Sequence, residues 1–444
     1  MFTSSLLAQI TCGKLVGNPH IKVNSFSIDS RNIKKGDVFI ALKGSRFDGN
    51  EFVKDAFEKG AIGAIAEKLV EVPQDKFLIL VNSSLEALKK IAKYKRENFK
   101  GKVIGVAGSA GKTTTKELLA HLLSFVGKVY KSPGNLNSQI GLPLSVANAP
   151  LDCDFWVLEH GASKRGEIKE LVRITKPFIR VITKIGEEHL EGFRSLEGII
   201  LGNGELFCFL SEPFIAVIPE DTIKYYGFIP KERLYTFGEK DIESYQITEE
   251  GVKAFIEGEE FFIPVPSLGI INNLVASIKV LRALGYKLKN FKEALSRFKP
   301  EWGRMEVIKL RNFTVINDTY NANPPSVENA IRSLSLMGNK KKIVILGDML
   351  ELGKYSKELH RKVGELLNEC KINVVFFSGE EIKEAYNVYR GLKFYTHSKE
   401  ELKRVLKENK EILKGSLTLV KASRGLRFED IVEFLRGVDD ELSG

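Results

Sequence analysis

A glycine-rich loop followed by lysine and threonine is the segment of this 444-residue sequence whose chemistry is most readily interpreted. The run Gly105-Val-Ala-Gly-Ser-Ala-Gly-Lys-Thr-Thr114 precedes a stretch with leucines at helical spacing. Glycines let backbone N–H groups approach phosphates, and a helix N-terminus adds positive potential. We expect a phosphate cradle in which Lys112 reaches the β- and γ-phosphates and the Thr113 hydroxyl binds Mg²⁺. The usual spacing has glycine where this chain has Val106, and a plain glycine turn is the alternative interpretation.

Two further polar residues follow strand-like apolar runs. Glu159 comes directly after the run 155–158, and α/β nucleotide enzymes place a metal-binding carboxylate at the end of such a strand. His189 lies beyond the run 180–183 and is a candidate for a second metal ligand. A helix cap or surface acid remains the alternative for Glu159, and an ordinary loop histidine remains the alternative for His189.

The net charge of +10 raises the question of an anionic partner. The Lys and Arg residues alternate with Glu along helix-like stretches such as 86–100 and 399–414, which is typical of solvated helix faces. A basic stripe with interleaved aromatic residues is missing from the sequence, so nucleic-acid binding is not expected. The composition, with 43% hydrophobic and 28% charged residues, is typical of a soluble globular protein.

Cysteine usage and the N-terminus point to the cytoplasm. Cys12, Cys153, Cys208 and Cys370 lie far apart and form no CxxC pair, so we expect reduced and mostly buried thiols. No apolar stretch approaches the length of a membrane span, and no basic region precedes the short apolar patch at the start of the chain.

The length exceeds what one ordinary core needs, and the pattern of apolar runs indicates three α/β domains. We place them at residues 1–99, 100–300 and 301–444. Strands separated by helical stretches predict parallel sheets covered by helices. The clearest strand-like runs are 37–42, 77–81, 102–107, 155–158, 180–183, 313–316, 342–346, 374–378 and 417–420, with helices expected at 113–126 and 356–370.

Several strings of this sequence resemble the Mur ligase family over nearly the whole chain. The most specific are Thr319-Tyr-Asn-Ala-Asn-Pro324 and Leu346-Gly-Asp-Met-Leu-Glu-Leu-Gly353. They are joined by the strings at 29–31, 36–44, 47–49, 107–114, 133–137, 140–143, 189–193, 303–305 and 421–425. The resemblance implies a small α/β domain for the uridine-nucleotide substrate, a central P-loop ATPase domain with a parallel sheet, and a C-terminal Rossmann-like α/β domain.

The resemblance also implies roles for particular residues. Catalytic roles fall on Lys112, Glu159, His189 and Arg304, and Mg²⁺ ligation falls on Thr113, Glu159 and His189. ATP contacts are expected at Ala107, Gly108, Ser109, Ala110, Gly111, Lys112, Thr113, Thr114, Asn272, Arg304 and Asp318. Substrate contacts are expected at Asp29, Ser30, Arg31, Asn135, Asn137, Tyr320, Asn321 and Asn323.

The implied activity is ATP-dependent amide-bond formation through an acyl phosphate, adding D-alanyl-D-alanine to UDP-N-acetylmuramoyl-tripeptide. Such an enzyme would act in the cytoplasm as a monomer that serves peptidoglycan synthesis, cell shape, cell division and the cell cycle. Two alternatives stay open. One is a family member that adds a single amino acid, and the other is a catalytically weak homologue that binds nucleotide or precursor as a partner.

This chain departs from the family pattern at several positions. Ala107, His160 and Leu268 stand where the family usually has Thr, Met and His. Asn203 falls on the family's carbamylated lysine, and Lys184 replaces an asparagine. One hypothesis is that the Lys184 cation stabilises the phosphoryl charge directly. The alternative is that Lys184 points to solvent and Asn203 is an amide with its hydrogen bonds satisfied.

Overall fold

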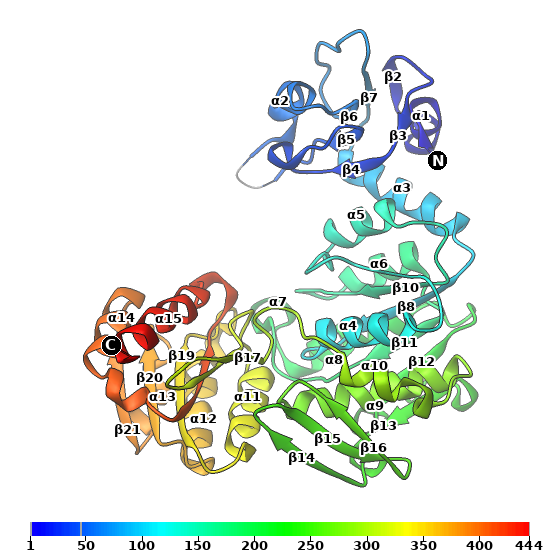
Figure 1. The fold of residues 1–444 in the computed structure, drawn as a ribbon. Helices are drawn as coiled ribbons and strands as arrows, with labels where there is room; N and C mark the ends of the chain where they lie inside the picture. The colour runs from blue at the N-terminus through cyan, green and yellow to red at the C-terminus, as the bar shows by residue number, and fades with distance from the viewer. Residues whose placement is uncertain (1, 45–46, 444) are drawn as a thin grey trace. The chain divides into compact units, whose positions relative to one another are not determined.

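The computed structural model describes residues 2–44 and 47–443 as an α/β protein (Figure 1). The chain divides into two compact units, each assembled from several stretches of sequence. The first unit comprises residues 1–105, 127–162 and 167–178, and the second comprises 106–126, 163–166 and 179–444. The boundaries expected near residues 99 and 300 stay predictions.

The N-terminal part of the first unit is a five-stranded sheet with the order β2-β7-β6-β5-β4, beside a two-stranded sheet of β1 and β3. Strands β4 to β7 are parallel, and β2 pairs antiparallel with β7. The strands are β1 Phe2–Thr3, β2 Lys14–Gly17, β3 Lys22–Val23, β4 Ser25–Ser27, β5 Asp37–Ile40, β6 Gly63–Ala66 and β7 Phe77–Leu80. The helices are α1 Ser4–Thr11, α2 Val53–Glu58 and α3 Ser84–Asn98.

Both faces of this sheet are buried, which explains why its strands read as continuous apolar runs. Val38 and Ile40 of β5 pack with the buried side chains of α1 and α3, whereas Phe39 packs with those of α2. Successive residues of a strand point to opposite faces, so one short strand supplies two cores. The predicted runs at 37–42 and 77–81 are confirmed as strands.

The rest of the first unit packs around the parallel pair β9 (Val129–Lys131) and β10 (Phe155–Glu159), with α5 (Gly141–Asn148) and α6 (Glu167–Thr175). Trp156 of β10 is fully buried, and its ring stacks on Phe99 with 3.8 Å between centroids. Strand β8 (Lys102–Ala107) begins in this unit, and its last two residues belong to the second.

The second unit carries the helix α4 (Lys112–Leu123) that follows the glycine loop. It also holds the parallel strands β11 (Ile179–Ile182), β12 (Ile215–Pro219) and β13 (Leu234–Phe237). Leu118, Leu119, Leu122 and Leu123 of α4 are all fully buried, as their helical spacing predicts. The further helices here are α7 Leu190–Phe193, α8 Leu196–Gly204, α9 Leu268–Ala283 and α10 Lys292–Ser296.

An antiparallel sheet of β14 (Ser244–Thr248), β15 (Gly251–Ile256) and β16 (Glu259–Ile263) was not anticipated. Burial alternates along β15, where Val252 and Ala254 are buried while Lys253 and Phe255 are exposed. A sheet with one solvated face gives this period of two, which a search for continuous apolar runs overlooks.

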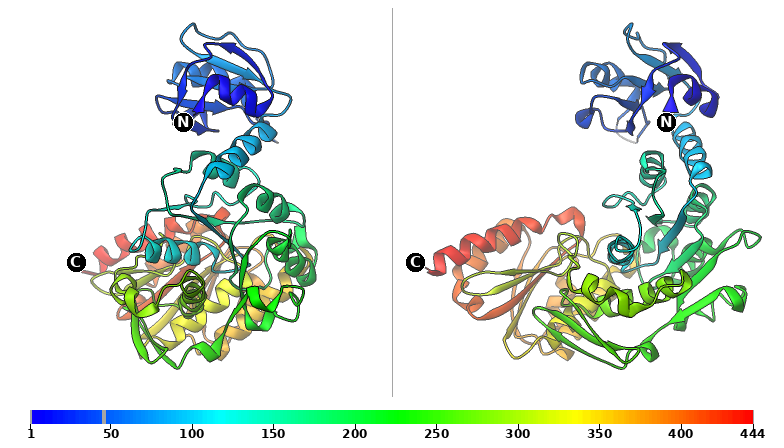
Figure 2. Two further views of the ribbon diagram at one scale, coloured as in Figure 1. Left: turned by 90° about the vertical axis from the view of Figure 1, so that its right-hand side faces the viewer. Right: turned by 45° about the vertical axis from the view of Figure 1, so that its right-hand side comes forward.

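The C-terminal part is a six-stranded sheet of order β17-β18-β22-β19-β20-β21, parallel except for β17. Helices α11 to α13 cover one face, and α14 and α15 cover the other (Figures 1 and 2). The strands are β17 Glu306–Lys309, β18 Thr314–Asn317, β19 Lys341–Gly347, β20 Val374–Ser378, β21 Leu392–Thr396 and β22 Ser416–Lys421. The helices are α11 Pro324–Leu336, α12 Ser356–Glu369, α13 Lys383–Val388, α14 Lys399–Glu408 and α15 Glu429–Ser443. The α/β fold expected for the C-terminal part of the chain is therefore confirmed, with helices on both faces of the sheet.

The expectation that most of the cysteines are buried was wrong. Cys153 is buried, Cys12 is exposed, and Cys208 and Cys370 are partly exposed. Cys12 lies at the end of α1, where the chain turns with a left-handed φ of 56°. Turns of this kind run over the surface, so its side chain meets solvent.

Within the described ranges, no single helix has the length and apolar character of a membrane span. By length and composition alone, α9 and the segment Leu288–Ser296 could together form a broken membrane span, with a bend of 118° between them.

Candidate nucleotide site

The glycine loop has the geometry that its sequence predicts. Strand β8 ends at Ala107, helix α4 begins at Lys112, and the loop between them uses two glycines with positive φ, 132° at Gly108 and 84° at Gly111. A Cβ on Gly108 would lie 2.3 Å from the Thr183 hydroxyl oxygen, so no larger residue fits without displacement. The loop therefore presents backbone N–H groups at a helix N-terminus, which is an anion-binding arrangement.

Lys112 is held inside this loop by Glu188, an acidic side chain that was not among the predicted site residues. Its ammonium lies 3.1 Å from a carboxylate oxygen of Glu188 and also donates to the carbonyl oxygen of Gly108. Glu188 is only 6% exposed. Burial raises the pKa of the Glu188 carboxyl, and the nearby Lys112 and His189 oppose that rise in part. The sequence offered no signal for Glu188, because Glu187 beside it has the same chemistry.

The loop is also fixed from α8 by Asn203. Its amide oxygen accepts a hydrogen bond from the Gly108 N–H at 2.9 Å, and its amide nitrogen donates to the Ile199 carbonyl at 3.1 Å. The side chain is 2% exposed, whereas that of Lys184 is exposed. These contacts favour the interpretation of Asn203 as a satisfied amide over a direct role for the Lys184 cation.

Residues from the C-terminal part reach the same loop. Arg304 donates to the Thr113 hydroxyl at 2.9 Å, and its guanidinium lies 4.1 Å from the centre of the Tyr320 ring. Asn323 caps the N-terminus of α11 and donates from its amide nitrogen to the Ser109 carbonyl at 3.2 Å. The structure thus brings Arg304, Tyr320 and Asn323 to the glycine loop, although about 190 to 210 residues of sequence separate them from it.

Asp318 follows β18 and is held on two sides. Its carboxylate accepts the N–H of Met305 at 3.1 Å and pairs with Lys421, which is 1% exposed. Burial lowers the pKa of Lys421, and Asp318 opposes that shift. Lys421 belonged to one of the family-like strings, yet no role had been expected for it. Asn321 lies nearby, and its backbone carbonyl accepts a hydrogen bond from Lys421 at 2.9 Å.

His189 contacts the string at 346–353 that is typical of the family. Its Nδ1 pairs with the carboxylate of Glu351, and its backbone adopts a left-handed φ of 44°. Asn272 lies on the exposed side of α9, whereas its neighbour Asn273 is 8% exposed and lies beside Gly111.

The remaining candidate residues lie in the first unit. Glu159 ends β10, is 2% exposed, and accepts a hydrogen bond from the amide nitrogen of Asn137 at 2.8 Å. Asn135 is exposed in the same connection. In the N-terminal part, Arg31 forms two hydrogen bonds with Asp29, at 2.9 and 2.8 Å, and this pairing lowers the pKa of Asp29 to about 2. Ser30 between them is 8% exposed.

Over residues 2–44 and 47–443, no group of three or more His, Cys, Asp or Glu side chains is arranged to hold a metal ion. A magnesium site built from this chain would therefore need hydroxyl or phosphate oxygens in addition.

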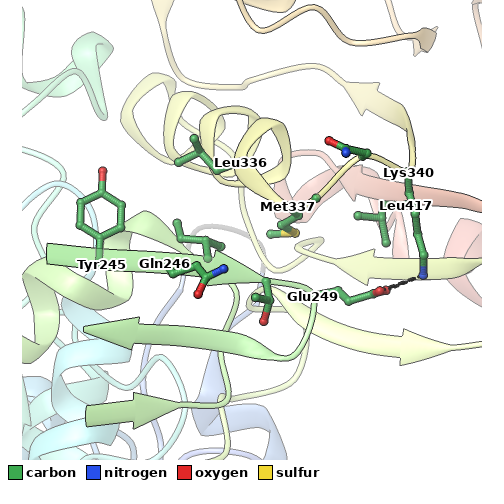
Figure 3. A pocket seen from close by; sticks show the side chains of 11 residues that line it. Tyr245, Gln246, Glu249, Leu336, Met337, Lys340 and Leu417 are labelled. Carbon is green, nitrogen blue, oxygen red and sulfur yellow. Dashed lines mark hydrogen bonds and ion pairs between the residues drawn. The ribbon is translucent and has the colours of Figure 1, made fainter. Parts of the chain in front are cut away.

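A groove of about 560 Å³ lies elsewhere in the second unit, between β14 and the segment that follows α11 (Figure 3). Its walls carry Tyr245, Gln246, Leu336 and Met337, and an ion pair between Lys340 and Glu249 crosses it at 2.8 Å. The groove contains none of the residues proposed for nucleotide or substrate.

Comparisons with known proteins identify the relatives of this chain. Residues 22–96 match the Mur ligase family catalytic domain, residues 106–281 the Mur ligase middle domain, and residues 303–424 the Mur ligase glutamate ligase domain. A UDP-N-acetylmuramoyl-tripeptide–D-alanyl-D-alanine ligase of Bacillus subtilis is 35% identical over 97% of both chains. The enzyme of the same name from Escherichia coli is 31% identical over 98% of both.

Solved structures give the same result. A MurF structure from Acinetobacter baumannii matches 98% of this chain and 99% of its own, with a TM-score of 0.90 and 28% identity. A MurF ligase from Thermotoga maritima in complex with ADP matches 94% of this chain and 98% of its own, with a TM-score of 0.83 and 32% identity. The agreement extends over sequence, domain models and fold, and the chain belongs to the Mur ligase family.

Proposed function

We propose that this chain is an ATP-dependent, ADP-forming ligase that adds D-alanyl-D-alanine to UDP-N-acetylmuramoyl-tripeptide in peptidoglycan precursor synthesis. The observation that carries the proposal is the phosphate cradle at the start of α4, with Arg304 donating to Thr113 beside Lys112. Relatives named for this activity match nearly the full chain, and one of the similar structures contains ADP.

The proposed reaction has two steps. The substrate carboxylate attacks the γ-phosphorus of ATP, which releases ADP and forms an acyl phosphate. The dipeptide amine then attacks the acyl carbon, and inorganic phosphate leaves. Lys112 and Arg304 would neutralise the negative charge on the phosphoryl group during its transfer, while the loop N–H groups hold the phosphates in place.

Magnesium is part of the proposal. Bound Mg²⁺ would neutralise phosphate charge and draw the γ-phosphoryl group into line. The Thr113 hydroxyl and the buried Glu159 carboxylate are oxygen donors of the kind Mg²⁺ prefers, whereas the His189 imidazole is a less usual ligand for it. Thr113 and Glu159 each have donor chemistry that fits the ion, and the assignment of all three residues as ligands stays a prediction.

The substrate residues are proposed on the family resemblance. Asp29, Ser30 and Arg31 would bind the uridine nucleotide, and the exposed Arg31 guanidinium is placed to meet an anionic group. The remaining proposed substrate contacts are Asn135, Asn137, Tyr320, Asn321 and Asn323. We further propose that the enzyme works as a cytoplasmic monomer.

The test is release of inorganic phosphate from ATP with Mg²⁺, UDP-N-acetylmuramoyl-tripeptide and D-alanyl-D-alanine, omitting each component in turn. We expect release only in the complete mixture, together with a product whose mass equals the tripeptide precursor plus the dipeptide minus water. Ligation of single amino acids in place of the dipeptide would favour a different member of the family. Nucleotide binding without any ligation would favour the catalytically weak homologue.

A further inference from the structure

A buried carboxylate stands where an anionic substrate has to bind. Glu188 lies against the phosphate-loop lysine, with its two oxygens 3.1 and 3.5 Å from the Lys112 ammonium. The same ammonium donates to the carbonyl oxygens of the loop. The cation that should meet phosphate is therefore already contacted by protein groups.

This arrangement has a consequence for nucleotide binding. Phosphate oxygens that approach Lys112 bring negative charge next to Glu188, and like charges repel strongly where water is excluded. Arg304 also lies at the loop, but it contacts the Thr113 hydroxyl. Lys112 cannot neutralise the phosphate and Glu188 fully at the same time, so nucleotide binding needs a further positive charge beside Glu188.

A divalent cation supplies that charge. Mg²⁺ takes carboxylate, hydroxyl and phosphate oxygens, and it is commonly held by one or two carboxylates together with substrate phosphates. Glu188 provides two buried oxygens, and the Thr113 hydroxyl follows Lys112 directly in the chain. Asn203 is fixed on the Gly108 N–H and offers only a neutral amide, so it brings no charge to this place.

We propose that Glu188 exchanges partners when nucleotide binds, releasing Lys112 to the phosphates and giving its carboxylate oxygens to the nucleotide-bound Mg²⁺. This inference rests on the proposed function, because it assumes that the loop binds a nucleoside di- or triphosphate. It assigns to Glu188 two effects of opposite sign. The carboxylate opposes binding of free nucleotide and supports binding of the magnesium complex.

The experiment compares the parent protein with Glu188→Gln, which removes the charge and keeps the shape. The dissociation constant for ADP is measured by calorimetry with excess Mg²⁺ and with EDTA. In the parent we expect Mg²⁺ to tighten ADP binding markedly. In Glu188→Gln we expect metal-free ADP to bind more tightly than in the parent, and the gain from Mg²⁺ to fall by roughly tenfold or more.

Glu187→Gln is the matched control, since it removes one charge from the neighbouring residue, which has no contact with Lys112 of the kind that Glu188 makes. We expect its gain from Mg²⁺ to equal that of the parent. Mn²⁺ in place of Mg²⁺ gives an independent readout, because the electron paramagnetic resonance signal of free Mn²⁺ is lost on binding. We expect Glu188→Gln to bind Mn²⁺ more weakly in the presence of ADP.

Two results would overturn the inference. If Glu188→Gln weakened ADP binding equally with and without Mg²⁺, the residue would only orient Lys112. If the gain from Mg²⁺ were unchanged, Glu188 would have no part in the metal complex. Failure of the parent itself to bind ADP would instead count against the proposed function, so the two failures are distinguishable. Thermal unfolding of both variants shows that any change in binding belongs to the folded protein.

Discussion

Asn203 gives the clearest quantitative prediction for the phosphate loop. In Asn203→Ala the Gly108 N–H loses its acceptor in a buried place, which costs about 1–3 kcal/mol. The Ile199 carbonyl loses a second donor but keeps its place in the α8 hydrogen-bond pattern, so it adds little. We therefore expect a destabilisation of about 2 kcal/mol, or a fall of about 4–8 °C in the thermal midpoint of the domain that contains the loop.

The same substitution should impair nucleotide binding, because a released Gly108 N–H lets the loop leave the geometry that presents its other N–H groups. We expect the dissociation constant for ADP to rise about fivefold or more, which corresponds to about 1 kcal/mol. Both quantities are accessible from thermal unfolding followed by circular dichroism and from calorimetric titration with ADP.

Asn368→Ala is the matched control. Asn368 makes the same pair of bonds, accepting the Arg390 N–H at 2.9 Å and donating to the Val388 carbonyl at 3.1 Å, but it is half-buried at the end of α12. Water can replace its amide there, so we expect a cost of about 1 kcal/mol and no change in ADP affinity. Equal ADP affinity in the parent and Asn203→Ala would refute the reasoning, whatever the effect on stability.

Lys112 and His360 carry two other predictions. Lys112→Ala should abolish ligation and also lower the thermal midpoint, because it leaves the buried Glu188 carboxylate without its cation; phosphate release and circular dichroism measure the two effects, and normal turnover would remove the basis for this ATP site. Burial lowers the pKa of His360, whose Nε2 accepts the Met349 N–H at 3.0 Å. The stabilisation by neutral His360 is then complete above its unfolded pKa of about 6.5 and is lost as pH falls through the lower folded pKa. Below pH 6 the thermal midpoint of the parent should drop more steeply with decreasing pH than that of His360→Gln. Parallel plots of thermal midpoint against pH would show that His360 contributes nothing.

The sequence was a good guide where local pattern decides structure. The run that became β8 and the leucines of α4 predicted the strand, loop and helix in order, and β20 has the bounds that its apolar run indicated. In each case the elements are buried on both faces or along one stripe, so hydrophobic spacing carries the information. In β15 only alternate residues are buried after the first two, and this strand was missed.

The candidate site was harder to foresee, because its contacts are long-range. Arg304 and Thr113 are 191 residues apart, and only the family resemblance suggested that they would meet at one nucleotide. Glu187 and Glu188 are adjacent acids, and nothing in their spacing says which of them is buried beside Lys112. Burial of a particular carboxylate depends on how the segment after β11 passes the glycine loop, which is a property of tertiary packing.

The central claim is that the tripeptide carboxylate attacks ATP directly, and oxygen labelling tests it most closely. UDP-N-acetylmuramoyl-tripeptide labelled with ¹⁸O in its acceptor carboxylate is incubated with ATP, Mg²⁺, D-alanyl-D-alanine and the protein, and the inorganic phosphate is analysed by mass spectrometry. An acyl phosphate transfers one carboxylate oxygen to the phosphate that leaves, so we expect one ¹⁸O in each phosphate released with product. Ligated product accompanied by unlabelled phosphate would contradict the account.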